Sequence, residues 1–398
     1  MKQKEKPPLI SFHTLRFHLG KIPDFRNPAR IRFTLAEILL LVIYCVIHGV
    51  YDCVNMEKLL KGKHHRKQIK KLFKIKQVPS HDTISRALRN IDPQELTKAL
   101  FEGFLCPLFP VPDHIAIDGK GIRAAAEKTK KGKVPYVLNV IDAATCLPLG
   151  QLAIPSKTNE IPQIPEIVRS LAGIRGCLIT TDAIGTQKEI IETILSKGAD
   201  YLLPVKSNQK TLKEDAYEYL DGYIDTNDEE RKGKVDTAVM ENRKHGRSDH
   251  RTVSVLSVQK DWSPPPGFES IRTVALIERR RQTYLQETPS FEEVVYISNR
   301  KMSAEEILKR TSEHWEIESG LHWTLDNVFN EDRMKARRGN AVSNGSAIRK
   351  FVYGIARLFA LKKDGVTTTE VMLHLRNNGE KIRELLTKRQ LSSQFFEI

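Results

Sequence analysis

Apolar positions recur at helical spacing along the first 105 residues of the chain. Thr34 can cap one helix, an almost continuous apolar run that Gly49 would end. A second helix can begin near Ser80, because Ile84 and Leu88 then fall on one face. The pattern therefore predicts a helical N-terminal region.

Beyond residue 112 the period shortens to that of strands. Short apolar runs predict strands over 114–118, 136–141, 148–154, 177–182 and 201–205, with helices over 161–171 and 187–197. Three strands in succession, followed by alternating helix and strand, predict an α/β fold: a mixed sheet with helices packed on it.

The remaining pattern completes the expected division of the chain. Strand-like segments separated by polar loops predict a β-rich insertion, and a helix returns at Ser303, which can form a capping box with Glu306 and run to about Phe329. We expect a helical N-terminal domain over 1–105, a catalytic core over 106–206 and 301–365, the insertion over 207–300 and a C-terminal tail over 366–398.

The charge balance changes this picture more than the composition does. The 398 residues, enough for two or three packed units, carry 64 Lys and Arg against 49 Asp and Glu, a formal net charge of +15. This excess favours a polyanionic partner, although a basic protein without one is equally compatible. A very basic segment near 61–74, followed by a helix with Arg86 and Arg89, fits a helix-turn-helix DNA reader or a plain helical bundle.

Cysteine usage and hydropathy indicate a compartment. Five cysteines are scattered without a Cys-x-x-Cys pair, which argues against a disulfide framework or thiolate zinc site and for reducing conditions. The start of the chain has no signal-peptide pattern, and the apolar run over 38–47 is half the ~20 residues that a membrane span needs. We expect a soluble cytoplasmic protein.

Two aspartates follow predicted strands directly. Asp118 precedes Gly119, and Asp182 ends a second apolar run. Functional side chains gather where strands of open α/β sheets end, and two carboxylates there repel each other unless they share a cation. Oxygen ligands without a thiolate select Mg²⁺ or Mn²⁺. The alternative is that each aspartate merely caps a turn.

A third carboxylate stands on the helix that begins near Ser303. His314, Glu318, His322 and Asp326 recur every four positions and would share one helical face. A zinc ion held by His314, Glu318 and His322 is one interpretation, but it leaves both aspartates without a role. Glu318 as third ligand of the aspartate site is another, and a solvated polar face is a third.

An ordered series of short motifs is more specific than any one of them. It comprises Ile115-Ala-Ile-Asp-Gly-Lys, Lys157-Thr-Asn-Glu-Ile, Thr181-Asp-Ala-Ile-Gly-Thr-Gln, Tyr201-Leu-Leu-Pro-Val-Lys-Ser-Asn-Gln, His245-Gly-Arg, Tyr296-Ile-Ser, His314-Trp-Glu-Ile-Glu-Ser-Gly-Leu-His-Trp-Thr-Leu-Asp, Glu331-Asp and Arg337-Arg-Gly-Asn. Over about residues 20 to 360 the chain resembles the H-repeat-associated transposases of bacterial insertion sequences, a DDE family with a ribonuclease-H-like core.

The resemblance implies that Asp118, Asp182 and Glu318 are the catalytic and metal-binding triad. Two Mg²⁺ or Mn²⁺ ions are expected, with Asp118 bridging both, Asp182 holding one and Glu318 the other. Water would free a 3′-OH at the element end, and that hydroxyl would then attack target DNA. The chain departs from the family at Ser312, where Arg is frequent, at Ser319 for Asn and at Thr158 for Ser; Arg310 is a candidate to supply the missing charge.

The implied partner is double-stranded DNA, both element ends and target, bound by a nucleoid-associated homodimer without a membrane or a nucleotide cofactor. Candidate phosphate contacts are Lys120, Arg123, Lys206, Arg247, Lys335, Arg337 and Arg338, while His314, His322 and Asp326 are expected to position DNA or orient Glu318. Two alternatives remain: a catalytically silent, transposase-derived DNA-binding protein, and a metal-dependent nuclease without strand transfer.

Overall fold

The computed structural model describes residues 12–125, 134–154, 160–244, 247–283, 288–334, 336–361 and 365–378. The chain divides into two compact units. Unit 1 comprises Met1–Val111, Gly119–Asn159 and Glu318–Ile398, and unit 2 comprises Pro112–Asp118 and Glu160–Ile317. Each unit is therefore built from segments that lie far apart in the sequence.

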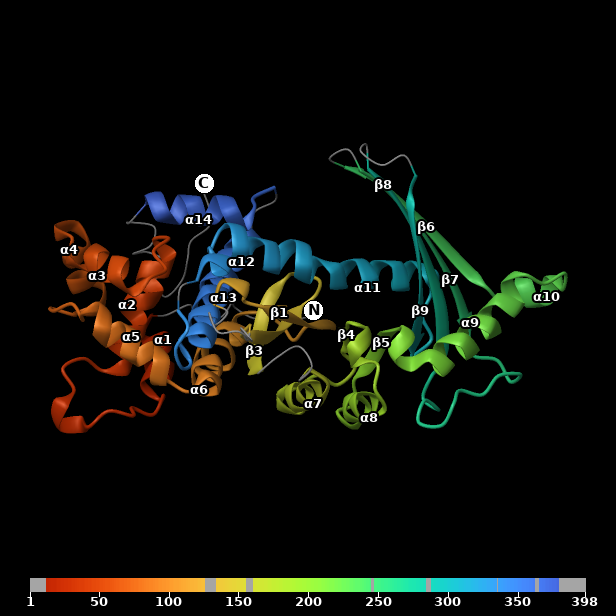
Figure 1. Ribbon diagram of the computed structural model, residues 1–398, viewed down its shortest axis with the longest axis horizontal. Helices are drawn as coiled ribbons and strands as arrows, with labels where there is room; N and C mark the ends of the chain where they lie inside the picture. The colour runs from red at the N-terminus through yellow and green to blue at the C-terminus, as the bar shows by residue number, and fades with distance from the viewer. Residues whose placement is uncertain are drawn as a thin grey trace, which may run out of the picture. The chain divides into compact units, whose positions relative to one another are not determined.

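Unit 1 is mainly helical (Figure 1). Its N-terminal helices are α1 (Phe12–Gly20), α2 (Leu35–Ile47), α3 (Cys53–Lys61), α4 (Lys63–Phe73), α5 (His81–Asn90), α6 (Pro93–Thr97) and the π-helical η2 (Lys98–Leu105). Later segments add the antiparallel pair β2 (Tyr136–Asp142) and β3 (Leu147–Ile154), then α12 (Trp323–Asn327), α13 (Ala341–Ala360) and α14 (Thr368–Asn377). The helical prediction for the N-terminal region is confirmed.

Helix α2 forms where the sequence predicts it. Thr34 caps the helix in a complete capping box with Glu37, and Gly49 ends it with a φ of 77°. All its residues except Glu37 are buried, because neighbouring helices cover it on several sides. One of these neighbours is α13, which also packs on α5, α6 and β3 and so forms the centre of unit 1.

Unit 2 contains a mixed sheet in the order β1-β4-β5-β9-β8-β7-β6 (Figure 1). The strands are β1 (His114–Gly121, of which residues 114–118 belong to unit 2), β4 (Leu178–Thr181), β5 (Asp200–Val205), β6 (Asp236–Lys244), β7 (Arg247–Ser257), β8 (Thr273–Thr283) and β9 (Ser290–Ser298). The helices are α7 (Glu160–Ser170), α8 (Lys188–Ser196), α9 (Lys210–Ile224), α10 (Glu229–Lys232) and α11 (Ala304–Glu316).

The predicted fold class is confirmed. Strands β1, β4 and β5 pair in parallel, whereas β5, β9, β8, β7 and β6 pair antiparallel. Three strands in succession along the chain, then helices alternating with parallel strands, are the pattern of a ribonuclease-H-like core. Helix α11 packs on β6 and β7, and its Ala304 and Ile307 join an apolar cluster with Leu178 and Leu202.

Residues 207–300 differ in part from the prediction of a β-rich insertion. Their four strands continue the sheet of unit 2, because β9 pairs directly with β5. Helix α9, which buries Leu212, Ala216 and Leu220, was missed because its apolar positions stand isolated among charged residues. Strand β6, the last strand of the order, is half-buried or exposed and carries charges.

The predicted C-terminal tail begins with an ordered helix. Helix α14 carries a capping box between Thr367 and Glu370 and buries Val371 and Met372 as it packs on α13. The predicted five-part division of the chain itself stays a prediction. Nowhere in the described ranges is a helix both long enough and apolar enough to span a membrane.

Asn344 of α13 ties the end of α5 into unit 1. Its side-chain amide is buried and donates to the carbonyl oxygens of Leu88 and Ile91, both at 2.9 Å. Asn344→Ala should lower the free energy of unfolding by about 1–3 kcal/mol, because the Leu88 carbonyl loses this buried donor. Chemical denaturation measures the loss. Asn90→Ala is the control: its amide is exposed, so a change larger than about 0.5 kcal/mol there would argue against burial as the cause.

Candidate active site

Asp118 and Asp182 follow two strands that are hydrogen-bonded to each other. In the parallel pairing of β1 with β4, Ile117 lies opposite Thr181, so the two aspartates come one position later on each strand. Side chains alternate along strands, and both aspartates therefore belong to the face of Ala116 and Thr180. Both are half-buried. Unit 2 thus brings the two predicted aspartates together at one sheet edge.

Asp182 also has a local structural role. Its carboxylate accepts a hydrogen bond from the backbone N–H of Ile184 at 3.1 Å and caps the short helix η6 (Ala183–Gly185). The turn-capping interpretation is therefore correct for this residue. It does not compete with ligand binding, since an ionised carboxylate has two oxygens and several lone pairs.

Glu318 is exposed and lies in a π-helical segment. Helix α11 continues into η8 (Ile317–His322) and then α12, so the predicted helix from Ser303 to about Phe329 is essentially confirmed. Single π-helical turns are rare in proteins as a whole, but those that occur are often found at functional sites. They also change the angle between successive residues, so the four-residue spacing of the sequence does not continue as one straight stripe.

The two histidines flanking Glu318 have separate partners. Nδ1 of His314 lies 2.9 Å from the Thr180 hydroxyl, whereas Nε2 of His322 accepts from the Asn139 amide at 3.0 Å. Burial lowers the pKa of His314 to about 4 and that of His322 to about 3. Across the residues that the structure describes, no three His, Cys, Asp or Glu side chains group closely enough to hold a metal, which applies to the zinc interpretation and equally to Asp118, Asp182 and Glu318.

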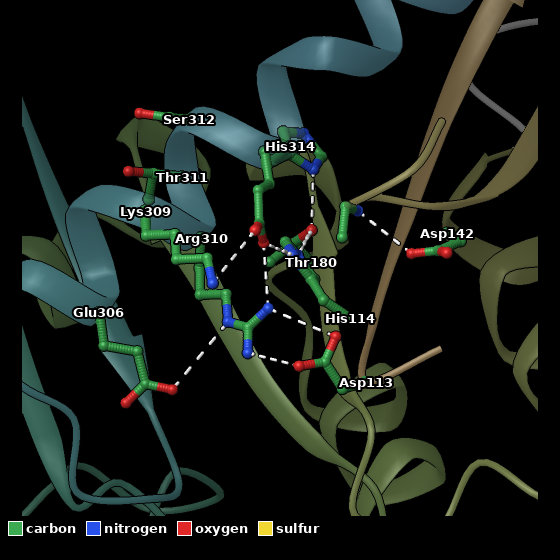
Figure 2. A network of polar contacts seen from close by, with 12 residues as sticks. Asp113, His114, Asp142, Thr180, Glu306, Lys309, Arg310, Thr311, Ser312 and His314 are labelled. Atoms are coloured by element: carbon green, nitrogen blue, oxygen red, sulfur yellow. Dashed lines mark hydrogen bonds and ion pairs between the residues drawn. The ribbon is translucent and has the colours of Figure 1, made fainter. Parts of the chain in front are cut away.

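His314 belongs to a chain of polar contacts in unit 2 (Figure 2). The Thr180 hydroxyl lies between His314 and His114, at 2.9 Å from Nε2 of the latter. Nδ1 of His114 lies 2.9 Å from the Glu313 carboxylate, which also accepts from Arg310 at 3.0 Å. Arg310 reaches Asp113 as well, at 2.8 Å. This chain joins β1, β4 and α11.

The charge expected near Ser312 comes from an unforeseen residue. Arg310 points away toward Asp113 and Glu313. Arg251 of β7 instead donates to the Ser312 hydroxyl at 3.2 Å, and its guanidinium lies 5.4 Å from the Trp315 ring centre. An arginine from the insertion therefore stands beside the position where the family frequently has one.

Lys120 and Asp326 belong to a buried charge cluster in unit 1. Lys120, only 8% exposed, contacts Asp326 and lies 3.0 Å from the fully buried Glu331. Ser346 donates to Glu331 at 2.7 Å, and the fully buried Lys350 donates to Ser346 at 2.9 Å. The ammonium group of Lys120 is thus engaged with carboxylates, so the structure gives it an intramolecular role in place of the expected phosphate contact.

The pKa values in this cluster follow from burial opposed by charge. Burial alone would raise the pKa of Glu331, but Lys350 and Lys120 outweigh it and lower the pKa to about 2. Burial lowers the pKa of Lys350 to about 8. It acts the same way on Lys120, but two carboxylate partners outweigh it there and the pKa is raised. Burial raises the pKa of Asp326 in spite of Lys120.

The other phosphate-contact candidates divide between the units. Arg123, Arg337 and Arg338 are exposed in unit 1, where the neighbouring Ile122 and Ala336 pack in one apolar cluster. Lys206 is exposed in unit 2 and pairs with Glu292 at 3.4 Å. Some of the predicted positions lie outside the described residues: Lys335, residues 157–159 (which include Thr158), His245 and the side chain of Arg247.

Sequence reasoning missed the network around Thr180. His114 stands in an apolar strand, and Arg310 and Glu313 are three positions apart on a helix, which is an ordinary spacing for a surface ion pair. The sequence signal that could have marked it is His114, a histidine at the start of an otherwise apolar strand, but its complete burial is known from the structure alone. The partners themselves are far apart along the chain.

Comparison with known proteins adds the family. A model described as "Transposase DDE domain" matches residues 109–355, and one described as "DDE_Tnp_1-associated" matches residues 17–102. The chain therefore belongs to the DDE transposase family.

Individual relatives narrow this class. "H repeat-associated putative transposase YhhI" of Escherichia coli (strain K12) is 33% identical over 85% of this chain and 89% of its own length. "Putative transposase YncI" of Escherichia coli O157:H7 is 31% identical over 87% of this chain and 88% of its own length. A solved piggyBac transposase synaptic complex is 11% identical over 94% of this chain and 81% of its own. Its TM-score of 0.44 is too low to add to the assignment. The chain is a transposase of the insertion-sequence kind.

Removing the charge of Glu331 should destabilise unit 1. Glu331→Gln leaves Lys120 and Lys350 without this buried counter-charge, and breaking a buried pair costs about 3–5 kcal/mol. The lowered pKa of Glu331 means that its stabilisation is complete above about pH 4.5 and is lost as the pH falls toward 2. Urea denaturation from pH 7 to pH 2 should show this loss in the wild type and its absence in the variant. The control, Asp332→Asn, removes an exposed neighbouring carboxylate and should resemble wild type.

Proposed function

We propose that this transposase cleaves and joins DNA with Asp118, Asp182 and Glu318 as its catalytic carboxylates. The observation that carries the proposal is the register of β1 with β4, which aligns Asp118 and Asp182 at one edge and on one face of the sheet. In a DDE enzyme these are the two carboxylates that must act together.

The third carboxylate, Glu318, follows the end of α11 by two residues, and α11 contacts the strands that carry the aspartates. Along α11, Arg310 contacts Asp113, and Glu313 then contacts His114 at the start of β1. His314 contacts Thr180, which lies opposite Ala116, two residues further along the sheet. The helix therefore advances in the same direction as β1 and β4.

The donor set fits a hard divalent cation. Asp118 and Asp182 are half-buried carboxylates, and no thiolate lies among the three proposed ligands, which suits Mg²⁺ or Mn²⁺. Members of the DDE family use such ions, and two of them bound here would activate the attacking oxygen and stabilise the leaving oxygen of an in-line displacement. Asp118, Asp182 and Glu318 would together hold these ions.

The reaction consists of two phosphoryl transfers. In the first, water attacks a phosphodiester at the element end, the P–O bond to the 3′ oxygen breaks, and a proton reaches that oxygen to leave a 3′-OH. In the second, this hydroxyl attacks a phosphodiester of the target, and the displaced oxygen leaves with a proton. The exposed Arg123, Arg337 and Arg338, together with Lys206, are proposed to contact the DNA backbone. On DNA we expect a homodimer, in the nucleoid of the cell.

Replacing any one carboxylate of the triad by its amide should abolish cleavage. We expect Asp118→Asn, Asp182→Asn and Glu318→Gln to lower the rate of nicking of element-end DNA roughly 10²–10³-fold or more, because charge stabilisation in the transition state is lost. Cleavage is measured with Mg²⁺ or Mn²⁺ under single-turnover conditions, and affinity for the same duplex is measured without metal.

Glu316→Gln is the matched control, since Glu316 is an exposed carboxylate two residues from Glu318 and should cleave like wild type. Near wild-type cleavage by the Asp118 or Asp182 variants would contradict the assignment. Wild-type binding without any cleavage would indicate a silent DNA-binding protein, and cleavage without joining would indicate a nuclease.

Affinity for duplex DNA should fall steeply with salt, because each phosphate contact releases counterions. In a plot of log affinity against log salt concentration, the slope should decrease by about 0.9 for each contacting arginine removed among Arg123, Arg337 and Arg338. Lys232→Ala, which removes an exposed cation of α10, should leave the slope unchanged. A flat plot for the wild type would refute DNA binding through this basic surface.

A further inference from the structure

The Thr180 hydroxyl connects the buried His114 with the half-buried His314. It lies 2.9 Å from Nε2 of His114 and 2.9 Å from Nδ1 of His314, and neither Thr180 nor His114 is more than 3% exposed. A hydroxyl has one proton to donate, so it cannot donate to both rings. The direction of each hydrogen bond in this chain is therefore determined by its far end.

That far end is Glu313. Burial alone would raise the pKa of Glu313, but hydrogen bonds from His114 and Arg310 outweigh it and keep the pKa low, so the carboxylate is ionised and only accepts. Nδ1 of His114 must then carry the proton. Burial lowers the pKa of His114, which keeps the ring neutral at physiological pH and makes its Nε2 an acceptor.

The remaining directions follow by elimination. Thr180 donates its only proton to Nε2 of His114, so its oxygen must accept from Nδ1 of His314. His314, whose pKa is about 4, is neutral and therefore holds its proton on Nδ1 with a lone pair on Nε2. Four groups from β1, β4 and α11 thus form one directed chain, Glu313–His114–Thr180–His314, which we term the Thr180 chain.

The Thr180 chain is held at its acidic end and lies close to the aspartates. Arg310 binds Glu313 at 3.0 Å and Asp113 at 2.8 Å, and Figure 2 shows its guanidinium directed toward Asp113. Thr180 stands two residues before Asp182, on the same face of the sheet. His314 stands four residues before Glu318, and the π-helical segment η8 begins between them at Ile317.

We propose that the Thr180 chain positions the third catalytic carboxylate. By joining β1 and β4 to the C-terminal turn of α11, it fixes the orientation of the helical turn from which the chain continues to Glu318. His314 and Thr180 are positioning residues, since they act through the helix and the strand. This inference rests on the proposed triad, but the hydrogen-bond pattern and the His314 tautomer are consequences of the structure that can be measured without cleavage.

The first test compares Thr180→Val, which keeps the shape but removes the hydroxyl, with Thr180→Ser, which keeps the hydroxyl. Thr180→Val should retain its denaturation midpoint within a few degrees and its affinity for duplex DNA. Its cleavage rate should fall, or its half-saturating Mn²⁺ concentration rise, about 10–100-fold, the usual effect of losing a hydrogen bond behind a metal ligand. Thr180→Ser should recover most of this loss. Wild-type kinetics in Thr180→Val would overturn the positioning role while leaving the triad intact.

A second pair of variants covers the case in which the valine does not fold. His314→Asn keeps a donor at the place of Nδ1, whereas His314→Ala removes it. Cleavage retained in the asparagine variant and lost in the alanine variant supports positioning through this hydrogen bond. Equal loss in both means that the ring does more than donate to Thr180, which contradicts the proposal.

The third readout is spectroscopic and independent of activity. Nitrogen-15 NMR of histidine-labelled full-length protein should find His314 protonated on Nδ1 in the wild type, and this preference should weaken in Thr180→Val. The measurement also separates two failures. If wild-type protein cleaves no DNA, the proposed function fails while the tautomer still tests the chain. A wild-type His314 protonated on Nε2 overturns the Thr180 chain whatever the cleavage result.

Discussion

The parallel pairing of β1 with β4 is the contact on which the candidate site depends. It aligns His114 with Leu178 and Ile117 with Thr181, so two segments separated by a hairpin and a helix end at the same sheet edge. A slip of one residue would turn one aspartate to the opposite face of the sheet. Both strands are buried on both faces, so a slip would bring each side chain against different close-packed neighbours, and this resists it.

The two units bury polar groups in different ways, and the physical reason is the cost of isolated charge. Unit 1 buries Glu331 and Lys350 completely, and the cluster is tolerable only because charges of both signs and the Ser346 hydroxyl lie together. Unit 2 buries the neutral His114 and leaves the charged Glu313 and its partner Arg310 slightly more exposed. The charge cluster of unit 1 stabilises one packing arrangement of its side chains. The hydrogen-bonded Thr180 chain of unit 2 fixes the orientation of α11 against the strands.

The strands of the insertion also support the helix that leads to Glu318. Asp249 of β7 holds Arg279 at 2.5 Å and Arg251 at 3.1 Å, and these hydrogen bonds outweigh burial and keep the pKa of Asp249 low. The Arg279 guanidinium lies 4.2 Å from the Trp315 ring centre, and Arg251 reaches Ser312. Ser312 of α11, where the family frequently has arginine, therefore lies next to Arg251 from strand β7. Within unit 2 the insertion is a structural part of the region around α11.

The sequence by itself determined the element types, the fold class and the family. Apolar periodicity placed α2, the strands around Asp118 and Asp182 and the long helix, because burying one face leaves a local and regular pattern. Only tertiary structure decided the register of β1 with β4, the addition of the insertion to the sheet and the partners of Lys120, Arg310 and His314. These depend on contacts between residues far apart in the chain. The sequence alone does not distinguish a buried lysine from an exposed lysine that binds DNA.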